Sequence, residues 1–404
     1  MTVKRYHEMG VTSCTATVLD CKALNDGNFD ILLDETAIYP EGGGQLSDTG
    51  YIGSARVLHA RDDGGYVWHT CDRAVAIGSK VDVKADKDVR LDHTQQHTGE
   101  HMLSGIAHTL FGCTNVGFHM AEDIVTVDFD KQLTQEQIDE LELRVNEAIQ
   151  RNEPTVIRTV TPEEYETIDI RKKAKGLKGE ITIVYAGGVD SCTCCGTHCE
   201  RAGEVGLLKI QSHTNYKGGT RIYFNCGMRA VILMQQDNAR MDTIARRFST
   251  SADRAVNAVI KQGDELADIK KELKRRTDAL FAYRADELYA ASDITKGVHA
   301  IVHIEQGIDM NELGMLGERI CANKNAVAVL FTKKPGQLSY RVMRSKDVSL
   351  SMRELIQAIN AMFNGKGGGR DDSAQGSAEL SGSHLSLNEA LEQLRNYLKK
   401  RLAE

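Results

Sequence analysis

The side chains best suited to chemistry lie in two short stretches of the chain. The first contains His93, His97 and His101, and the second contains Cys194 and His198. Residues four apart lie on one face of a helix, so His97 and His101 can direct two imidazoles at one point. Cys194 and His198 repeat this four-residue step. Because imidazole and thiolate are zinc ligands, the two pairs predict one zinc site.

The spacing excludes a zinc protease. That class needs Glu directly after the first His, where this chain has Thr98; Glu100 instead precedes the second His. His93 is also four residues from His97, but a helix drifts by roughly 80° over eight residues. The three histidines therefore cannot ligate equally, and one of them lies beside the site or in solvent. Zinc held by three His and one Cys can polarise a water molecule only if one of these four ligands is weak or absent.

Cysteines strengthen the case for metal. A His pair on a helix is more often a surface accident than a ligand pair, but four cysteines fall within residues 192–199. In a chain without a secretory signal, such a cluster indicates metal binding before disulfides. Asp190 precedes the cluster and is placed to orient a ligand histidine, as carboxylates around metal sites do.

Three motifs, in this order, resemble the AlaX-type alanyl-tRNA editing proteins, which are free-standing relatives of the editing domain of alanyl-tRNA synthetase. They are residues 39–50 with the run Gly42-Gly43-Gly44-Gln45, residues 95–104, and the Cys-Gly-Thr-His of residues 195–198. The resemblance implies an aminoacyl-tRNA deacylase with one Zn²⁺ per chain, held by His97, His101, Cys194 and His198. Whether Cys194 or Cys195 is the thiolate ligand stays open.

The same resemblance suggests catalytic residues. Gln45, beside the glycine run, becomes a candidate for contacting the aminoacyl group, and Glu100 and Thr98 are further catalytic candidates within the histidine motif. The glycine run lets backbone amides approach a ligand closely, or it forms only a tight turn. No serine or cysteine nucleophile with a paired base stands out, which favours attack by water. Zinc would either polarise that water or bind the amino acid.

Length and charge bound the organisation. The chain has 404 residues, which predicts roughly three domains, and its net charge is −7. That charge argues against a protein that coats nucleic acid, although a local basic patch can still bind RNA. Residues 1–10 lack the apolar core of a signal peptide, and no run approaches the roughly 20 apolar residues of a membrane span. We expect a cytoplasmic protein without a membrane partner.

The pattern predicts an α+β multidomain fold. Short strands at 16–19, 29–33, 55–59 and 66–69 predict a small β-barrel in residues 1–91. A zinc-binding editing domain follows in residues 92–228, with helices at 92–111 and from 134 to 149 and strands at 124–129, 155–160 and 181–185.

A helical arm is expected in residues 229–292. Val259, Leu266, Leu273 and Leu280 recur every seven residues, which predicts a coiled coil. Gln262 and Arg276 interrupt the seam, favouring a short intramolecular hairpin over a long parallel dimer.

A C-terminal α/β domain is expected in residues 293–404. We predict strands at 299–304, 326–331 and 340–343 and helices at 310–322, 352–363 and from 387 to 398. This part resembles the glycine-rich C-terminal domain shared by alanyl-tRNA synthetases and the long AlaX proteins, so the resemblance covers nearly the whole chain. It allows a homodimer through this domain and, at the level of the wider family, ATP binding.

Two basic segments are candidates for holding tRNA. Residues 171–178 contain five basic residues in eight, and a loop over residues 365–376 is rich in glycine. Such segments either hold phosphates or are merely solvated surface, and the loop lacks the Gly-Lys-Ser/Thr ending of a P-loop. The predicted tRNA contacts are Lys172, Lys173, Lys175, Lys178, Lys366 and Arg370.

These features predict a zinc-dependent hydrolase that cleaves the ester of mischarged tRNA(Ala), chiefly that of serine and also that of glycine. An alanine pocket cannot strongly reject residues that differ by a hydroxyl or methyl group, because such differences are worth only roughly 1–3 kcal/mol. The alternatives are a non-catalytic, zinc-stabilised tRNA-binding module and a hydrolase for another mischarged tRNA.

Overall fold

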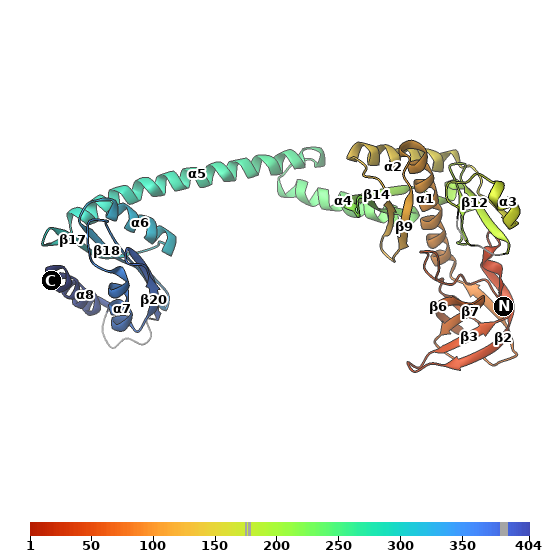
Figure 1. The fold of residues 1–404 in the computed structure, drawn as a ribbon, viewed down its shortest axis with the longest axis horizontal. Helices are drawn as coiled ribbons and strands as arrows, with labels where there is room; N and C mark the ends of the chain where they lie inside the picture. The colour runs from red at the N-terminus through yellow and green to blue at the C-terminus, as the bar shows by residue number, and fades with distance from the viewer. Residues whose placement is uncertain (174–175, 177–178, 380–386) are drawn as a thin grey trace. The chain divides into compact units, whose positions relative to one another are not determined.

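The computed structural model describes residues 1–173, 176, 179–379 and 387–404. The chain folds into two compact units, Met1–Arg246 and Arg247–Glu404, and each contains both helices and sheets (Figure 1). The predicted multidomain α+β class is confirmed. Among the described helices, none combines the length and apolar character that a membrane crossing requires.

The first unit opens with a closed barrel of six strands in the order β2-β3-β7-β6-β5-β8. Alternating apolar residues such as Val18, Ile31 and Val57 are buried inside it. The predicted small barrel is therefore confirmed, although β5 and β8, which close it, were not predicted. The elements here are β1 (Val3–Lys4), η1 (Arg5–His7), β2 (Ser13–Ala23), β3 (Phe29–Leu33), β4 (Glu35–Thr36), β5 (Gly50–Ile52), β6 (Ala55–Asp63), β7 (Tyr66–Cys71) and β8 (Lys80–Ala85).

Helix α1 (Lys87–Phe111) follows the barrel directly and carries the histidines. It begins before the predicted start at Asp92, because Arg90 in its first turn is buried and donates from Nε to Asp48 Oδ2 at 2.9 Å. This tertiary ion pair stabilises a polar turn that lacks apolar periodicity. The helix ends where Gly112 adopts a φ of 63°, which glycine accommodates without strain.

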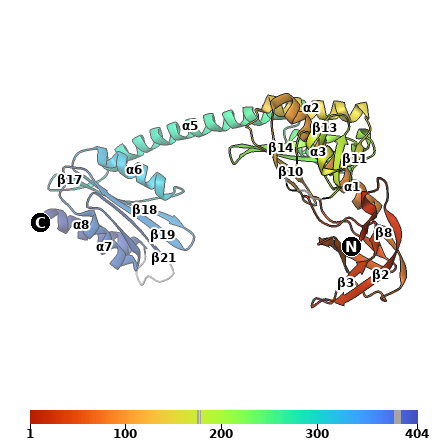
Figure 2. The ribbon, with the colours of Figure 1, turned by 45° about the vertical axis from the view of Figure 1, so that its right-hand side comes forward.

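Two sheets and helix α2 surround α1 (Figure 2). Leu103 of α1, Leu141 of α2 and Phe224 of β15 belong to one hydrophobic core, whereas Ile181 and Ile183 of β12 belong to a separate one. A four-stranded antiparallel sheet has the order β14-β15-β10-β9, and a three-stranded one has the order β11-β12-β13. The hairpin β14–β15 was not predicted. The elements are β9 (Asn115–Met120), β10 (Val125–Phe129), α2 (Gln135–Arg151), β11 (Val156–Val160), α3 (Pro162–Thr167), β12 (Ile181–Ala186), β13 (Asp190–Thr193), η2 (Ala202–Val205), β14 (Leu208–Tyr216) and β15 (Gly219–Cys226).

The expected arm is helical. It consists of α4 (Gly227–Arg247) and α5 (Ala252–Ala290). The predicted seam lies on α5, where Val259 is 45% exposed and Leu273 and Leu280 are each 63% exposed. A coiled coil therefore stays a prediction.

The second unit is built on one sheet in the order β16-β17-β18-β19-β21-β20. Only β17 and β18 pair in parallel among the described strands of this sheet. This makes the unit a mixed α+β sheet rather than the expected α/β domain. Its elements are β16 (Asp293–Thr295), β17 (Val298–Glu305), α6 (Met310–Ala322), β18 (Ala326–Lys334), β19 (Gln337–Arg344), α7 (Met352–Phe363), β20 (Lys366–Gly369), β21 (Ser373–Glu379) and α8 (Leu387–Ala403).

The glycine-rich segment is not the predicted loop. It forms the hairpin β20–β21, in which Gly367 pairs with Gly376. A Cβ added to Gly376 would lie 2.5 Å from the ring of Tyr340, which is fully buried. This glycine is therefore required where the sheet packs on an aromatic side chain.

Candidate metal centre

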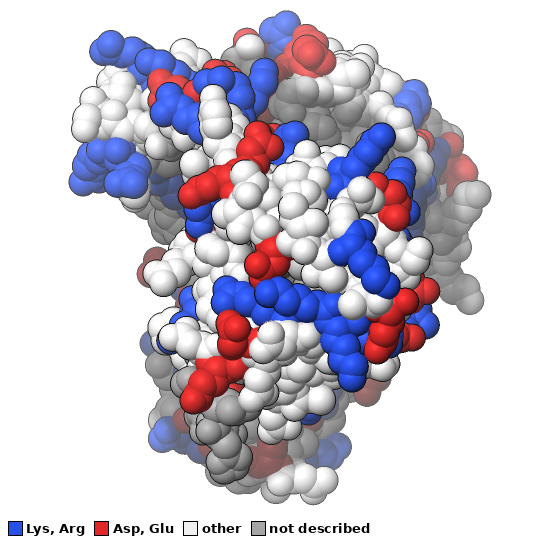
Figure 3. Space-filling model, turned by 90° about the vertical axis from the view of Figure 1, so that its left-hand side faces the viewer, with Lys and Arg blue, Asp and Glu red and all other residues white. Residues whose placement is uncertain are grey.

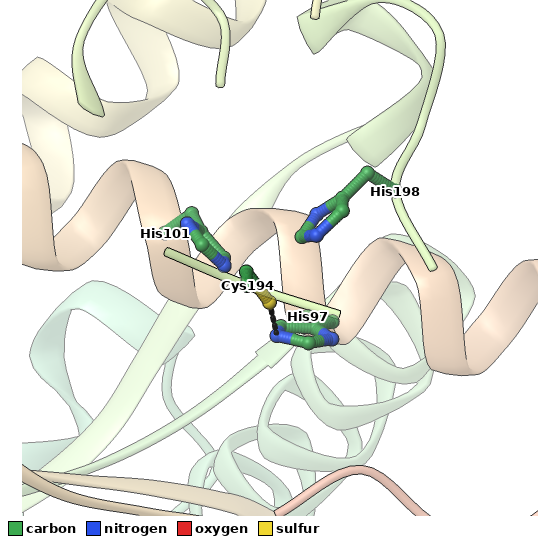
Figure 4. Close-up of side chains that lie close together, drawn as sticks. All are labelled: His97, His101, Cys194 and His198. Atoms are coloured by element: carbon green, nitrogen blue, oxygen red, sulfur yellow. Dashed lines mark hydrogen bonds between the residues drawn. The ribbon is translucent and has the colours of Figure 1, made fainter. Parts of the chain in front are cut away.

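The two predicted pairs meet in the first unit. One nitrogen of each of His97, His101 and His198 and the sulfur of Cys194 all lie within 4.8 Å of one another. Figure 4 shows the two helix histidines on successive turns of α1, with Cys194 between them and His198 approaching from a separate segment. Bonds of about 2.0–2.3 Å to one tetrahedral zinc would separate ligand atoms by about 3.3–3.8 Å. The cluster needs only small adjustments to reach that spacing.

Gln45 orients His97. The Nδ1–H of His97 donates to Gln45 Oε1 at 2.7 Å, and the backbone N–H of Thr197 donates to the same oxygen at 3.1 Å. Gln45 Nε2 in turn donates to Thr197 Oγ1 at 2.9 Å. With Nδ1 protonated, His97 directs the lone pair of Nε2 toward Cys194 Sγ, 3.4 Å away.

Asp190 orients His101 in the same way. The Nδ1–H of His101 donates to Asp190 Oδ2 at 2.8 Å, which leaves Nε2 free for a metal. Arg171 lies on the other side of the carboxylate and donates from Nε to Oδ1 at 2.5 Å and from Nη2 to Oδ2 at 2.9 Å. Each helix histidine thus has a fixed tautomer.

Cys194 and His198 reach the site without a helix. They follow β13 in an irregular segment, so the helical explanation of their four-residue step is wrong. The chain turns at Gly196, whose N–H donates to Cys194 Sγ at 3.4 Å. A Cβ at Gly196 would lie 2.0 Å from His97 Cε1. The glycine of the Cys-Gly-Thr-His motif therefore lets the backbone pass directly against the His97 ring.

This contact gives a testable prediction. Gly196→Ala should displace His97 and lower zinc affinity by about 10- to 100-fold or more, the cost usual for disturbing the surroundings of a ligand. Gly42→Ala is the control, because a Cβ there would meet only the Tyr39 hydroxyl at 3.9 Å. Competition with a chromophoric chelator measures both affinities. Equal affinities in the two variants would show that His97 is not held against this turn.

The electrostatics of the cluster favour a cation. The pKa of the Cys194 thiol is well below its usual value because the imidazoles of His97, His198 and His101 outweigh burial. The pKa of Asp190 falls to about 2 because hydrogen bonds from Arg171 and His101 likewise outweigh burial. The anionic groups around His101, led by Cys192 and Cys194, raise the pKa of that imidazole against burial. Positive charge is stabilised where the ligand atoms converge.

The surroundings of His198 test whether these residues suit a bound metal ion. Neither ring nitrogen of this buried histidine has a hydrogen-bond partner within the described part of the chain, and burial lowers its pKa to about 4. An unpaired, buried, neutral imidazole is costly unless it binds something. Three imidazoles, each neutral once it binds a metal, and one thiolate fit Zn²⁺.

The other predicted site residues lie around this cluster. Thr98 donates to Thr94 O at 2.8 Å and accepts from Cys199 N at 2.9 Å. Glu100 accepts from Ser104 Oγ at 2.5 Å and from Asn115 Nδ2 at 2.6 Å.

Two alternatives left open by the sequence can also be placed. The cluster contains Cys194, whereas Cys195 is exposed. His93 is buried outside the cluster, and its Nδ1 lacks a hydrogen-bond partner among the described residues.

A pocket of about 360 Å³ opens beside the cluster. Thr94, Thr197 and His198 form its inner wall, and the hydroxyls of the two threonines are 2.8 Å apart. Tyr6 and Lys87 also line it. This volume is at the small end of the range for ligand pockets.

The predicted tRNA contacts are spread over both units. Lys172 Nζ donates to Asn115 O at 3.1 Å, and Lys173 Nζ donates to Glu166 O at 2.9 Å; Lys175 and Lys178 lie outside the described residues. Lys366 is on the exposed strand β20, and Arg370 in the hairpin turn is 82% exposed. Figure 3 shows one face of the molecule, on which Lys and Arg form a band interspersed with Asp and Glu.

Sequence reasoning missed three residues that shape the site. Arg171 holds Asp190, Thr197 joins Gln45 to Thr94, and Phe118 stacks on His97 with ring centroids 5.4 Å apart. Thr197 lies within the Cys-Gly-Thr-His motif, so its position between two ligands was a usable signal. Arg171 was hidden within a basic run, and Phe118 had no local signal.

Two family models match the chain. The "Threonyl and Alanyl tRNA synthetase second additional domain" matches residues 181–223, which include Cys194 and His198, and the "DHHA1 domain" matches residues 295–403.

Curated relatives extend the similarity to nearly the whole chain. "Alanyl-tRNA editing protein AlaX-L" of Pyrococcus horikoshii is 28% identical over 97% of this chain and 98% of its own length. "Alanyl-tRNA editing protein Aarsd1" of Rattus norvegicus is 29% identical over 61% of this chain and 64% of its own length. "Alanine--tRNA ligase" of Thermofilum pendens is 27% identical over 92% of this chain, which spans only 41% of that enzyme.

These matches agree with the order of the motifs and with the architecture described above. The barrel and the histidine helix come first, the cysteine-containing segment follows, and the DHHA1 match coincides with the sheet of the second unit. The resemblance suggested by the sequence is confirmed: over nearly its whole length the chain is similar to the long form of the AlaX-type alanyl-tRNA editing proteins, and its C-terminal part matches the DHHA1 domain.

Proposed function

We propose that this chain is an aminoacyl-tRNA deacylase that hydrolyses mischarged tRNA(Ala), chiefly Ser-tRNA(Ala) and also Gly-tRNA(Ala), with one zinc per chain. The observation that carries the proposal is the convergence of His97, His101, Cys194 and His198 within 4.8 Å. The comparison supports it, because the relative that matches over 98% of its own length is named an alanyl-tRNA editing protein. Bound zinc would supply positive charge that polarises water or holds the amino group of the substrate.

The chain's own residues have distinct parts in this proposal. Gln45 and Asp190 hold the two helix histidines by their Nδ1–H groups. Both lone pairs of Gln45 Oε1 are used, so we assign this residue to positioning His97 rather than to contacting the aminoacyl group. Thr98 and Glu100 position the Cys199 backbone and β9 through their hydrogen bonds.

The pocket beside the cluster is the proposed place of the aminoacyl group. Thr94, Thr197 and His198 line it, and the hydroxyls of the two threonines are 2.8 Å apart. Lys87 at its exposed rim is placed to meet a phosphate of the acceptor end. Water is the nucleophile in this proposal, and the enclosing walls limit which esters reach it.

A panel of charged tRNAs tests the function against its alternatives. Purified protein should release serine from Ser-tRNA(Ala) faster than it deacylates mischarged tRNAs of other specificities. A binding module would retain Ser-tRNA(Ala) with its ester intact. Faster turnover of another mischarged tRNA would assign the site to that substrate.

The second unit is proposed to hold tRNA away from the reacting ester. We predict that ending the chain after Arg246 leaves hydrolysis of a short acceptor-stem substrate nearly unchanged, while whole tRNA binds more weakly and with a flatter salt dependence. Loss of phosphate contacts such as those proposed for Lys366 and Arg370 would cause both changes. Ending at the unit boundary, rather than at the predicted residue 228, keeps Arg229, whose Nε donates to Asp92 of α1 at 2.8 Å.

Filter binding at several salt concentrations measures the affinity for whole tRNA and its salt dependence. Light scattering measures the oligomeric state. A truncated protein that becomes monomeric but binds whole tRNA with unchanged affinity and salt slope would assign the second unit to dimerisation alone. Homodimerisation, cytoplasmic location and ATP binding stay predictions from the sequence and its family resemblance.

A further inference from the structure

Two overlapping sets of metal-binding side chains share His101. The first is the zinc cluster described above. The second consists of His101, Asp190 and Cys192, all buried, with ligand atoms that also lie within 4.8 Å of one another. Cys192 Sγ is 3.4 Å from Nδ1 of His101, on the opposite side of the ring from the nitrogen that faces the first set. A metal in the second set would compete for the same imidazole.

Arg171 is bound to the second set. Its guanidinium makes two hydrogen bonds to Asp190, and its side chain is only 8% exposed while that of Asp190 is fully buried. The position is fixed by backbone as well, because Arg171 N donates to Ser191 O at 2.9 Å and Thr193 N donates to Lys172 O. The arginine is therefore part of the site's framework and not of a phosphate-binding surface.

This geometry has two consequences. Asp190 is oriented so that Oδ2 accepts from His101 Nδ1, which directs Nε2 to the first set. A cation bound between Asp190, Cys192 and Nδ1 would lie beside the guanidinium, where two positive charges repel at low dielectric. It would also have to remove the proton that Nδ1 donates to Asp190.

We infer that Arg171 selects between the two donor sets, by orienting His101 for the first and by closing the second to metal. This inference rests on the zinc site of the proposed function and adds a positioning residue to it. The guanidinium takes the place that a metal would occupy beside Asp190. Zinc is thereby confined to one position, next to the pocket that Thr197 and His198 line.

Three variants separate the orientation of His101 for the first donor set from the exclusion of metal from the second. Arg171→Gln removes the positive charge and the two-pronged hydrogen bonding of the guanidinium to Asp190. Arg171→Lys keeps the positive charge but cannot donate two parallel hydrogen bonds to the carboxylate. Arg171→Gln combined with Cys192→Ser removes the thiol of the second set. Arg221→Gln is the matched control, because Arg221 makes a similar bidentate pair with Asp128, at 2.6 and 2.7 Å, between β15 and β10.

The readouts are zinc content, the rate of zinc release to a chelator, and the thiolate-to-metal absorption of the cobalt-substituted protein. Arg171→Gln should weaken zinc binding by about 10- to 100-fold and should add absorption from a second thiolate. That added absorption should vanish in the double variant. Arg171→Lys should show faster zinc release but no second thiolate, and Arg221→Gln should match the unaltered protein.

Wild-type zinc release and an unchanged cobalt spectrum in Arg171→Gln would overturn the inference. If that variant does not fold, Arg171→Lys still decides, because release at the unaltered rate would contradict the orienting role. An unaltered protein that binds no zinc but deacylates Ser-tRNA(Ala) would overturn this inference and the zinc site together. Suppose that the unaltered protein binds zinc and the Arg171 variants change zinc release and the cobalt spectrum as expected, but neither the unaltered protein nor any variant deacylates Ser-tRNA(Ala). That result would refute the proposed activity and leave the inference standing.

Discussion

Replacing Cys194 with alanine is expected to remove zinc from the protein and to abolish deacylation with it. Cys194 is the only thiol of the first donor set, and its pKa is well below the usual value because three imidazoles surround it. Without the thiolate, three neutral imidazoles must hold Zn²⁺ with no anionic ligand. We expect a loss of zinc affinity well beyond the roughly 10- to 100-fold that disturbing an outer partner costs.

Three neighbouring cysteines provide controls in the same segment. Cys192→Ala and Cys199→Ala should keep zinc because neither sulfur belongs to the first set, and Cys195→Ala should keep it because Cys195 is exposed. Elemental analysis of the four purified variants measures the outcome. Full zinc in the Cys194 variant with loss in the Cys195 variant would show that the wrong thiol has been assigned.

Discrimination between serine and alanine is the second large effect. Thr94 and Thr197 line the pocket, and their hydroxyls, which lie 2.8 Å apart, are the groups that we expect to form a further hydrogen bond with the hydroxyl of a seryl group. Alanine would leave these buried groups without that partner. A site that hydrogen-bonds a substrate hydroxyl rejects the analogue lacking it by factors on the order of 10⁴. Ala-tRNA(Ala) should therefore be hydrolysed about 10⁴-fold more slowly than Ser-tRNA(Ala).

The comparison uses one tRNA carrying either amino acid under the same conditions. Thr94→Val keeps the shape of the side chain but removes its hydroxyl. It should lower the ratio of the Ser-tRNA(Ala) to the Ala-tRNA(Ala) hydrolysis rate, mainly by slowing the seryl reaction. The Thr197 hydroxyl also holds Gln45, and for that reason Thr94 is the cleaner choice. Similar rates for the two esters with the unaltered protein would refute recognition of the hydroxyl.

Local pattern was sufficient to single out the four clustered residues but not to explain why all of them converge. His97 and His101 follow from helical periodicity, and α1 does place them on successive turns. Cys194 and His198 have the same spacing in an irregular segment, where a turn at Gly196 brings them together. The family motif identified these residues, and only the fold explains their spacing.

Long-range partners were beyond the reach of the sequence. Arg171 belonged to a basic run that suggested phosphate binding, yet its contact with Asp190 buries it. The glycines of residues 365–376 suggested a loop, but the segment forms the hairpin β20–β21, in which Gly376 packs against Tyr340. In each case a tertiary contact determined the local structure; phosphate contacts of Lys366 and Arg370 stay a prediction.

In the barrel and in the second unit, too, the sequence pattern predicts individual strands but not which strands pair. The apolar alternation of β2, β3, β6 and β7 predicts strands, whereas β5 has only three residues and gives little periodic signal. Its pairing with β6 and β8 closes the barrel. Alternating helices and strands suggested an α/β domain, but the order β16-β17-β18-β19-β21-β20 depends on pairings that periodicity does not encode.

The central claim is that the His97, His101, Cys194 and His198 cluster hydrolyses the ester of Ser-tRNA(Ala) when it holds zinc. Single-turnover release of labelled serine, measured on protein samples whose zinc content ranges from none to one per chain, tests it most directly. The account predicts that the fraction of active protein rises in proportion to zinc content and that the zinc-free protein is inactive. Zinc-loaded protein that binds Ser-tRNA(Ala) and leaves its ester intact would contradict the account.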